Sequence, residues 1–185
     1  MVSWSRMCKS KLEGGMGFCD LYAFNLVMLA KQGWRMLENP ALLMARMYKA
    51  GYFPNRDILN ASIGSNPSYA WRSIYKSIEI IQEGTRWRVG NGKTIHIWDN
   101  RRLPTPTTYK VIYPRKDFGD FAMVLALIDQ DIRRWRKDTL DRIYLAFKVE
   151  NILSILIPYY PQEDQLIWVG NKKGIFTVRS AYFFG

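Results

Sequence analysis

Residues 86–98 read Arg86-Trp-Arg-Val-Gly-Asn-Gly-Lys-Thr-Ile-His-Ile-Trp98, two short runs of strand-forming residues separated by a Gly-Asn-Gly-Lys turn. Asn-Gly tolerates the positive φ that tight hairpin turns require. Trp, Val, Ile and Thr suit a pleated, half-buried surface. The stretch therefore predicts a β-hairpin.

The hydrophobic pattern also predicts the register of this hairpin. A three-residue loop at 91–93 pairs Val89 with Ile95 and Trp87 with Ile97, which puts four apolar side chains on one face. The residues on the other face are then Arg86, Arg88, Thr94, His96 and Trp98. A two-residue Asn-Gly loop scatters the apolar residues over both faces, so we favour the longer loop with a bulge.

A second hairpin is predicted near the C-terminus, where 166–169 and 175–179 flank a turn at 170–174. Ser180 then suits the N-cap of a helix that begins at Ala181. The sequence stops after about one helical turn, well short of the ~12 residues at which an isolated helix becomes marginal. We therefore expect a chain that is cut within an element.

Periodic apolar residues predict helices in the rest of the chain. The strongest candidate spans 21–37 behind an N-cap at Asp20, and it is apolar over most of its circumference, as in buried helices. Further helices are predicted at 41–50, 67–84, 140–147 and 152–157. The expected fold class is α+β, mainly helical with two short β-hairpins. It is incomplete as an independent domain because isolated hairpins need partner layers.

The composition is that of a folded, basic protein. The 185 residues are 48% hydrophobic and 15% aromatic, unlike a disordered chain. Twenty-seven Lys and Arg against 16 Asp and Glu give a net charge of +11, which favours polyanionic partners such as nucleic acid. No apolar run approaches the ~20 residues that span a bilayer, and the N-terminus lacks a signal-peptide core. We expect no membrane partner.

Few residues are suited to metal binding or catalysis. The chain has two cysteines, Cys8 and Cys19, and one histidine, His96, which excludes an ordinary four-ligand Cys/His zinc site. A disulfide between the cysteines stays open, although free thiols are favoured because nothing indicates secretion. Glu163 and Asp164 are adjacent in an extended loop, where neighbouring side chains point apart, so they form a poor acid/base pair. We expect no catalytic residue, metal or cofactor.

A basic cluster surrounds Trp135. Its members are Arg133, Arg134, Arg136 and Lys137. Cations around an aromatic ring can bind a phosphate backbone and stack a base. The alternative is a solvated flank with one tryptophan docked in the core.

Many ordered motifs give the chain a family resemblance. They include Cys8-Lys-Ser-Lys-Leu-Glu-Gly-Gly-Met-Gly-Phe18, Leu29-Ala-Lys-Gln-Gly-Trp-Arg35, Ser68-Tyr-Ala-Trp-Arg-Ser-Ile74 and Glu83-Gly-Thr-Arg-Trp-Arg-Val-Gly-Asn-Gly92. Over nearly its whole length the chain resembles plant non-LTR (LINE-type) retrotransposon polyproteins. The matching region lies between the reverse-transcriptase palm and the zinc-binding and ribonuclease H segments. Gly174-Ile-Phe-Thr-Val-Arg-Ser-Ala-Tyr182 resembles the opening of the zinc-binding domain.

The resemblance implies a division into four segments and a non-catalytic role. The segments are a helical part at 1–84, a hairpin at 85–104, a connector with short helices at 105–164 and a truncated start of the zinc-binding domain at 165–185. The family's polymerase centre needs two adjacent aspartates to hold magnesium, and this chain contains no Asp-Asp pair. The ribonuclease H carboxylates would lie after Gly185. We therefore expect no enzymatic activity from these residues.

Two functions follow from this resemblance. In the first, the segment helps to hold an RNA template or an RNA–DNA hybrid beside the polymerase, through contacts that depend on salt and not on sequence. The expected contact residues are Arg86, Arg88, Arg101, Arg102, Arg133, Arg134, Trp135, Arg136 and Lys137. In the second, the segment is a scaffold that docks onto the remainder of the reverse-transcriptase polyprotein and binds no nucleic acid.

Overall fold

Helices predominate in the computed structural model, which describes residues 3–8, 11–97 and 122–184. Within these ranges the strands form two small, two-stranded antiparallel sheets, so the mainly helical α+β class is confirmed. The chain divides into two compact units. Unit 1 comprises Met1–Gly84 and Gly170–Gly185, and unit 2 comprises Thr85–Val169.

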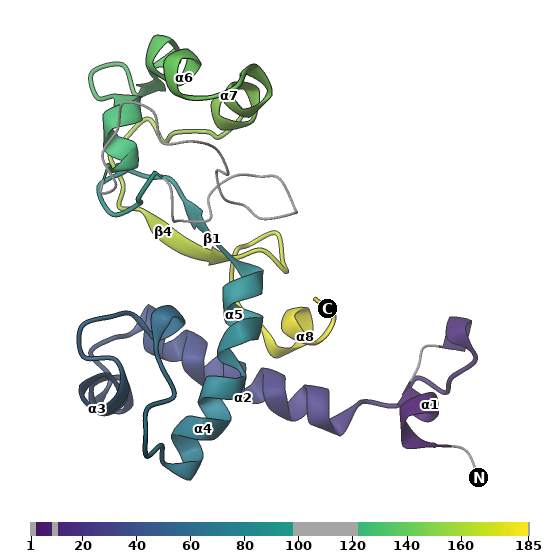
Figure 1. Cartoon of the computed structure of the whole chain (residues 1–185). Helices are drawn as coiled ribbons and strands as arrows, with labels where there is room; N and C mark the ends of the chain where they lie inside the picture. The colour runs from purple at the N-terminus through teal and green to yellow at the C-terminus, as the bar shows by residue number, and fades with distance from the viewer. Residues whose placement is uncertain (1–2, 9–10, 98–121, 185) are drawn as a thin grey trace. The chain divides into compact units, whose positions relative to one another are not determined.

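The regular elements in the described part of unit 1 are all helices (Figure 1). Its elements are α1 (Trp4–Cys8), η1 (Lys11–Glu13), α2 (Leu21–Glu38), α3 (Leu43–Tyr52), η2 (Ile58–Asn60), α4 (Tyr69–Lys76), α5 (Ile78–Gly84) and α8 (Val178–Tyr182). The predicted cap of α2 is confirmed, because the Asp20 carboxylate accepts hydrogen bonds from the backbone N–H groups of Tyr22 and Ala23. The longest helix therefore begins where the sequence predicts.

Two predicted helix boundaries in unit 1 are wrong for local reasons. The helix predicted at 41–50 starts only at Leu43, as α3, because Asn39 closes α2 by donating its backbone N–H to Arg35 O. The predicted helix at 67–84 is divided at Ser77. This buried residue caps α4, and its hydroxyl donates to Ile74 O at 2.7 Å. A serine that binds the preceding turn competes with continued helix formation.

Trp71 is the centre of the core of unit 1. Its side chain is 0% exposed. The Tyr52 ring stacks on it at a centroid distance of 4.8 Å and an interplanar angle of 9°. Tyr48, Phe53 and Tyr75 lie around the same indole, at centroid distances of 5.4 to 6.1 Å. Aromatic pairs at such separations add to the stabilisation that comes from burial alone, so this cluster fixes α3 against α4.

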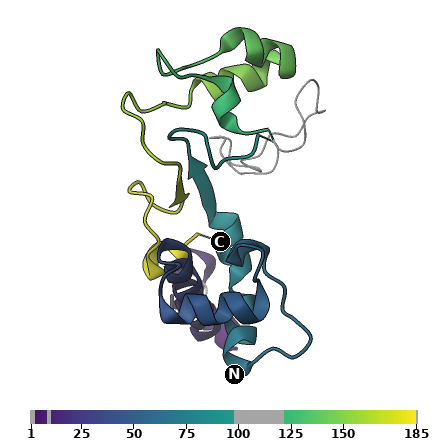
Figure 2. The same ribbon diagram turned by 90° about the vertical axis from the view of Figure 1, so that its left-hand side faces the viewer.

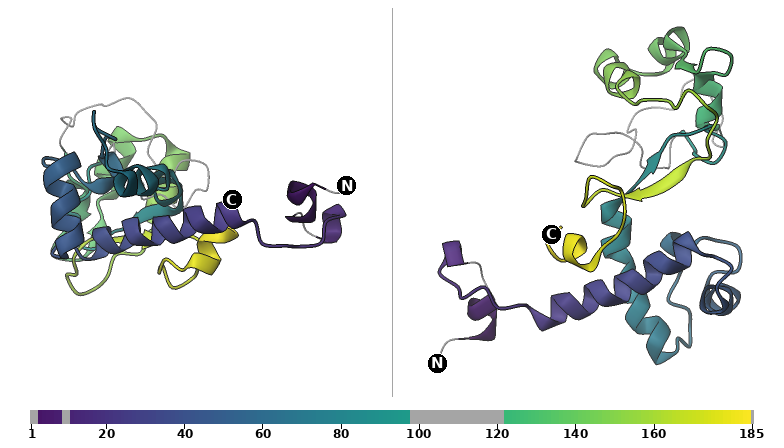
Figure 3. Two further views of the ribbon diagram at one scale, coloured as in Figure 1. Left: turned by 90° about the horizontal axis from the view of Figure 1, so that it is seen from below. Right: turned by 180° about the vertical axis from the view of Figure 1, so that it is seen from behind.

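The C-terminal segment packs on α2, and the predicted second hairpin does not form. Residues 175–177 are not a strand. Thr177 caps α8 in a capping box with Ser180, the residue that was predicted to be the cap itself. Figure 3 shows α8 beside α2 in both views. Lys31 Nζ donates to Phe176 O at 3.0 Å, and the backbone N–H of Asp20 donates to the Tyr182 hydroxyl at 2.8 Å.

Unit 2 combines two small sheets with short helices. Its elements are β1 (Thr85–Arg88), η3 (Val124–Leu127), β2 (Ile128–Asp129), β3 (Arg134–Trp135), α6 (Lys137–Ile143), α7 (Ala146–Leu153) and β4 (Gln165–Trp168). β1 and β4 lie side by side in both Figure 1 and Figure 2, paired antiparallel with Thr85 opposite Trp168 and Arg88 opposite Gln165. β2 and β3 form a local hairpin.

The strand pairing predicted for 86–98 is therefore wrong, although the predicted apolar face is right. The first half of the stretch pairs with β4, and the second half binds residues 122–125 through bonds such as Val124 N–H to Ile95 O. Val89, Ile95 and Ile97 nevertheless share one buried cluster, with Trp87 packed against it. The alternation of apolar residues reports burial, and it does not identify the strand that supplies the hydrogen bonds.

Candidate nucleic-acid interface

Arg86 and Arg88 project from the same face of β1. Successive side chains of a strand point to opposite sides, so the residue between them, Trp87, faces the other way and packs on the core of unit 2. Arg88 is exposed and Arg86 is half-buried. Their neighbours on β4 are Gln165 and Ile167, both without charge. The strand thus presents two cations on one side of a firmly packed element.

The loop that follows β1 is held by the carboxylate of Asp164. Oδ1 accepts from the backbone N–H groups of Gly90 at 2.8 Å and Gly92 at 2.9 Å. Oδ2 accepts from both the backbone N–H and the hydroxyl of Thr94 at 2.9 Å. Successive backbone N–H groups in a turn form a concave anion site, and here the anion is supplied by the chain itself. We call Gly90–Thr94 with Asp164 the carboxylate brace.

The brace depends on glycine at two positions. A Cβ at Gly90 would lie 2.5 Å from the carbonyl oxygens of Gln162 and Glu163. Gly92 has φ +73°, and a Cβ there would lie 2.6 Å from Leu125 N. Partial burial raises the pKa of Asp164, but the hydrogen bonds from Thr94, Gly90 and Gly92 together outweigh it and hold this pKa below its ordinary value. The brace therefore contains an ionised carboxylate at neutral pH.

Arg133 is directed into unit 2 and does not belong to its surface. The residue is 9% exposed, and its guanidinium donates to Gly90 O at 2.8 Å, to Gln130 Oε1 at 3.2 Å and to Pro158 O at 3.3 Å. Its backbone has φ +52°, in the left-handed region. This placement differs from the predicted surface contact, because Arg133 is buried and three of its five N–H donors already have acceptors within unit 2.

The other members of the predicted basic cluster differ in whether they are exposed or packed against the core. Trp135 is half-buried against the core, and its indole N–H donates to Ile155 O at 2.8 Å, which matches the docked alternative. Arg134 and Arg136, on either side of it, are exposed, as is Lys137 at the start of α6. Arg134 lies opposite Asp129 in the β2–β3 register. Three exposed cations therefore remain, and two acidic residues lie beside them, Asp129 opposite Arg134 and Asp138 next to Lys137.

Some predicted site residues cannot be placed. Arg101 and Arg102 lie outside the described residues, and their role stays a prediction. Cys8 and Cys19 are both free thiols. In the described ranges, no three His, Cys, Asp or Glu side chains lie close enough together to hold a metal ion. None of the helices described has both the length and the apolarity that crossing a membrane needs.

Comparison with known proteins gives two plant relatives. The chain is 41% identical over 107 residues to the uncharacterized mitochondrial protein AtMg00310 of Arabidopsis thaliana, an overlap that covers 57% of this chain and 70% of that protein. It is 23% identical over 188 residues to a second Arabidopsis thaliana protein, named Putative ribonuclease H protein At1g65750. That overlap covers 98% of this chain and 30% of the relative. No protein-family model and no solved structure matches the chain.

Proposed function

Since the chain belongs to the family of the uncharacterized mitochondrial protein AtMg00310, we propose that it is a non-catalytic segment of a plant LINE-type reverse-transcriptase polyprotein that holds an RNA–DNA hybrid. Its relatives are consistent with an origin in a plant retrotransposon. The second relative is named a ribonuclease H protein, and this chain spans about 30% of it. A nuclease that acts on RNA in hybrids would act on the ligand proposed here.

The pair of cations on β1 is the observation that carries this proposal. Arg86 and Arg88 share one face of a strand whose opposite side is anchored by Trp87, and the loop after it is fixed by the carboxylate brace. Cations held on a rigid element contact phosphates without reading the bases. Such contacts release condensed counterions, so affinity falls steeply as salt rises.

The cations of β1 and the exposed cations beside Trp135 form the proposed contact set. Its described members are Arg86, Arg88, Arg134, Arg136 and Lys137. Arg133 is left out because backbone and amide oxygens already bind its guanidinium. Trp135 is left out because its ring packs on the core and its N–H is bound. The proposed contact is therefore made to phosphates, with no base stacked on Trp135.

Exposed apolar residues on α2 favour a second candidate, a scaffold without nucleic-acid affinity. Leu21, Phe24 and Met28 recur at helical spacing near the start of α2, and all three are exposed, as is Tyr22. Contiguous exposed apolar side chains mark protein interaction sites more often than chance. In this reading the basic charge is solvated surface and the remainder of the polyprotein covers α2.

Fluorescence anisotropy with a labelled RNA–DNA hybrid separates the two candidates. We expect Arg86→Ala/Arg88→Ala to weaken binding about tenfold at low salt and to lower the slope of log affinity against log salt by about two. The matched control is Lys172→Ala/Lys173→Ala, which removes the same charge from an exposed turn of unit 1. Circular dichroism confirms that each variant is folded. Equal losses in both variants, or no binding by the folded chain, would favour the scaffold.

A further inference from the structure

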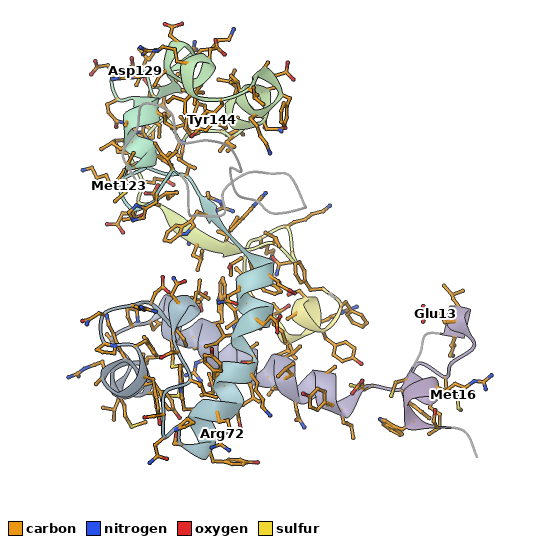
Figure 4. The ribbon with its side chains drawn as sticks, viewed as in Figure 1. Glu13, Met16, Arg72, Met123, Asp129 and Tyr144 are labelled. Carbon is orange, nitrogen blue, oxygen red and sulfur yellow. The ribbon has the colours of Figure 1, made fainter. Side chains whose placement is uncertain are left out.

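One face of α4 combines an exposed aromatic ring with two cations. Tyr69, Arg72, Ser73 and Lys76 are spaced at i, i+3, i+4 and i+7, which places them on a single stripe of the helix. Tyr69 is 85% exposed, and Arg72 and Lys76 are exposed as well. Figure 4 marks Arg72 on this helix. We call these four residues the α4 stripe.

The α4 stripe is mounted on a rigid support. The opposite side of α4 carries Trp71 and Ile74, both buried in the aromatic core of unit 1. Ser68 caps the helix by accepting from Trp71 N–H, and its own backbone N–H donates to the Tyr52 hydroxyl at 2.9 Å. The helix is therefore fixed at its start and along its buried face. A ring on such a helix loses little backbone freedom when it binds a ligand.

The charged residues in the sequence that contains the α4 stripe, residues 58–78, are basic. No acidic residue occurs between Asp57 and Glu79, and the Asp57 carboxylate is already hydrogen-bonded to Asn60. Unit 1 contains 13 Lys and Arg against 6 Asp and Glu, whereas unit 2 contains 14 against 10. Most of the net charge that favours a polyanion thus belongs to unit 1, although all the contact residues predicted from the sequence lie in unit 2.

We infer that the α4 stripe binds single-stranded nucleic acid, with a base stacked on Tyr69 and neighbouring phosphates on Arg72 and Lys76. Every base has a π-face, so a ring flanked by cations binds single strands with little sequence preference. A base inside a duplex is stacked on its neighbours and cannot accept this ring. The inference rests on the proposed function for its class of partner, but it assigns a different surface and a different form of that partner.

Binding of a labelled single-stranded RNA oligonucleotide to the full chain tests this inference. We expect Tyr69→Ala to weaken that binding about tenfold, and Tyr69→Phe, which keeps the ring, to retain it. Neither variant should change binding of the RNA–DNA hybrid. Arg72→Ala/Lys76→Ala should lower the salt slope for the single strand by about 1.4, because each phosphate contact to a single strand contributes about 0.7. The matched control is Tyr159→Ala, which removes an equally exposed tyrosine from unit 2.

The outcomes separate this inference from the proposed function. Tyr69 is exposed, so its replacement should leave the circular dichroism spectrum and the unfolding midpoint unchanged. Unchanged single-strand binding in Tyr69→Ala, or an equal loss in Tyr159→Ala, would refute the binding of single-stranded nucleic acid by the α4 stripe. If hybrid binding does not respond to Arg86→Ala/Arg88→Ala, the proposed contact set of unit 2 is wrong. That result leaves the inference about the α4 stripe unaffected. A folded chain that binds neither ligand overturns both.

Discussion

The two units are held together in different ways. Unit 1 has an aromatic core, in which the rings of Tyr48, Tyr52, Phe53 and Tyr75 surround the buried indole of Trp71. Unit 2 has a mainly aliphatic core, and two charged side chains tie its loops. Asp164 binds three backbone N–H groups, and Arg133 binds two backbone carbonyls.

This difference follows from the secondary structure of each unit. Helices satisfy most of their own backbone groups, so apolar rings do most of the joining in the helical unit, with a few polar contacts such as Lys31 to Phe176 O. Unit 2 contains short strands and irregular loops, whose buried N–H and C=O groups must find partners elsewhere. Charged side chains supply these partners with stronger hydrogen bonds than neutral groups give. Unit 1 should therefore depend on packing, and unit 2 on polar contacts.

The largest effect should come from removing the central ring of unit 1. Trp71→Ala deletes a completely buried indole and the contacts of four neighbouring rings, at a cost of about 4 kcal/mol in the free energy of unfolding. Hydrogen exchange followed by mass spectrometry should show loss of protection in α3 and α4. The amides of β1 and β4 should keep theirs. Equal loss of protection in both units would contradict the division into two cores.

The next effect should come from unit 2, where Asp164→Ala removes the carboxylate brace. Four hydrogen bonds are lost, but water reaches part of the freed loop, so we expect a cost of about 2 kcal/mol. Exchange should rise at Gly90–Thr94 before any change in unit 1. Glu163→Ala is the matched control, since it removes an exposed neighbouring acid and should change stability by less than about 0.5 kcal/mol.

These two residues also show what could be predicted from the sequence. The spacing of Trp71, Ile74 and Ile78 predicts an apolar helical stripe, because helix contacts are local and periodic. The sequence indicates only that Asp164 and Glu163 form a poor acid/base pair, because the partners of Asp164 at Gly90–Thr94 are about 70 residues away in the chain. No local pattern encodes a side chain that reaches a distant loop. The Gly-Asn-Gly turn predicted the tight loop, but not the anion inside it.

The same limit explains the strand pairing and the basic cluster. The alternation of apolar residues predicts which face of 86–98 is buried. It does not predict the hydrogen-bond partners, because these are β4 and residues 122–125, which are distant in the sequence. The basic cluster contains three arginines that the sequence cannot tell apart. Arg133 is buried because it has partners inside unit 2, whereas Arg134 and Arg136 are exposed. The α4 stripe corresponds in the sequence to the polar residues between the periodic apolar ones, but this pattern alone does not distinguish a binding surface from a solvated face.

Arg133 and Arg134 offer a sharper test within unit 2, at identical change of charge. Arg133→Met leaves the carbonyls of Gly90 and Pro158 without their donor and should cost about 1.5 kcal/mol. Arg134→Met, at an exposed position, should change stability by less than about 0.5 kcal/mol. Hybrid binding should respond in the opposite way, weakening in Arg134→Met and not in folded Arg133→Met. Equal effects on stability would show that Arg133 does not tie the loops of unit 2.

The smallest expected effect is the loss of stability of the carboxylate brace at low pH. Because the pKa of Asp164 is lower in the folded chain than its ordinary value of 3.8, its contribution to stability is complete above that value and is lost as pH falls through the folded pKa. Protection of Gly90–Thr94 should therefore decline below about pH 3.8, and Asp164→Asn should flatten this dependence. The aromatic cluster of unit 1 contains no carboxylate, so protection around Trp71 should change less over the same range. A decline equally steep at Trp71 would mean that acid acts through overall charge, and the contrast between a packed unit and a polar-braced unit would fail.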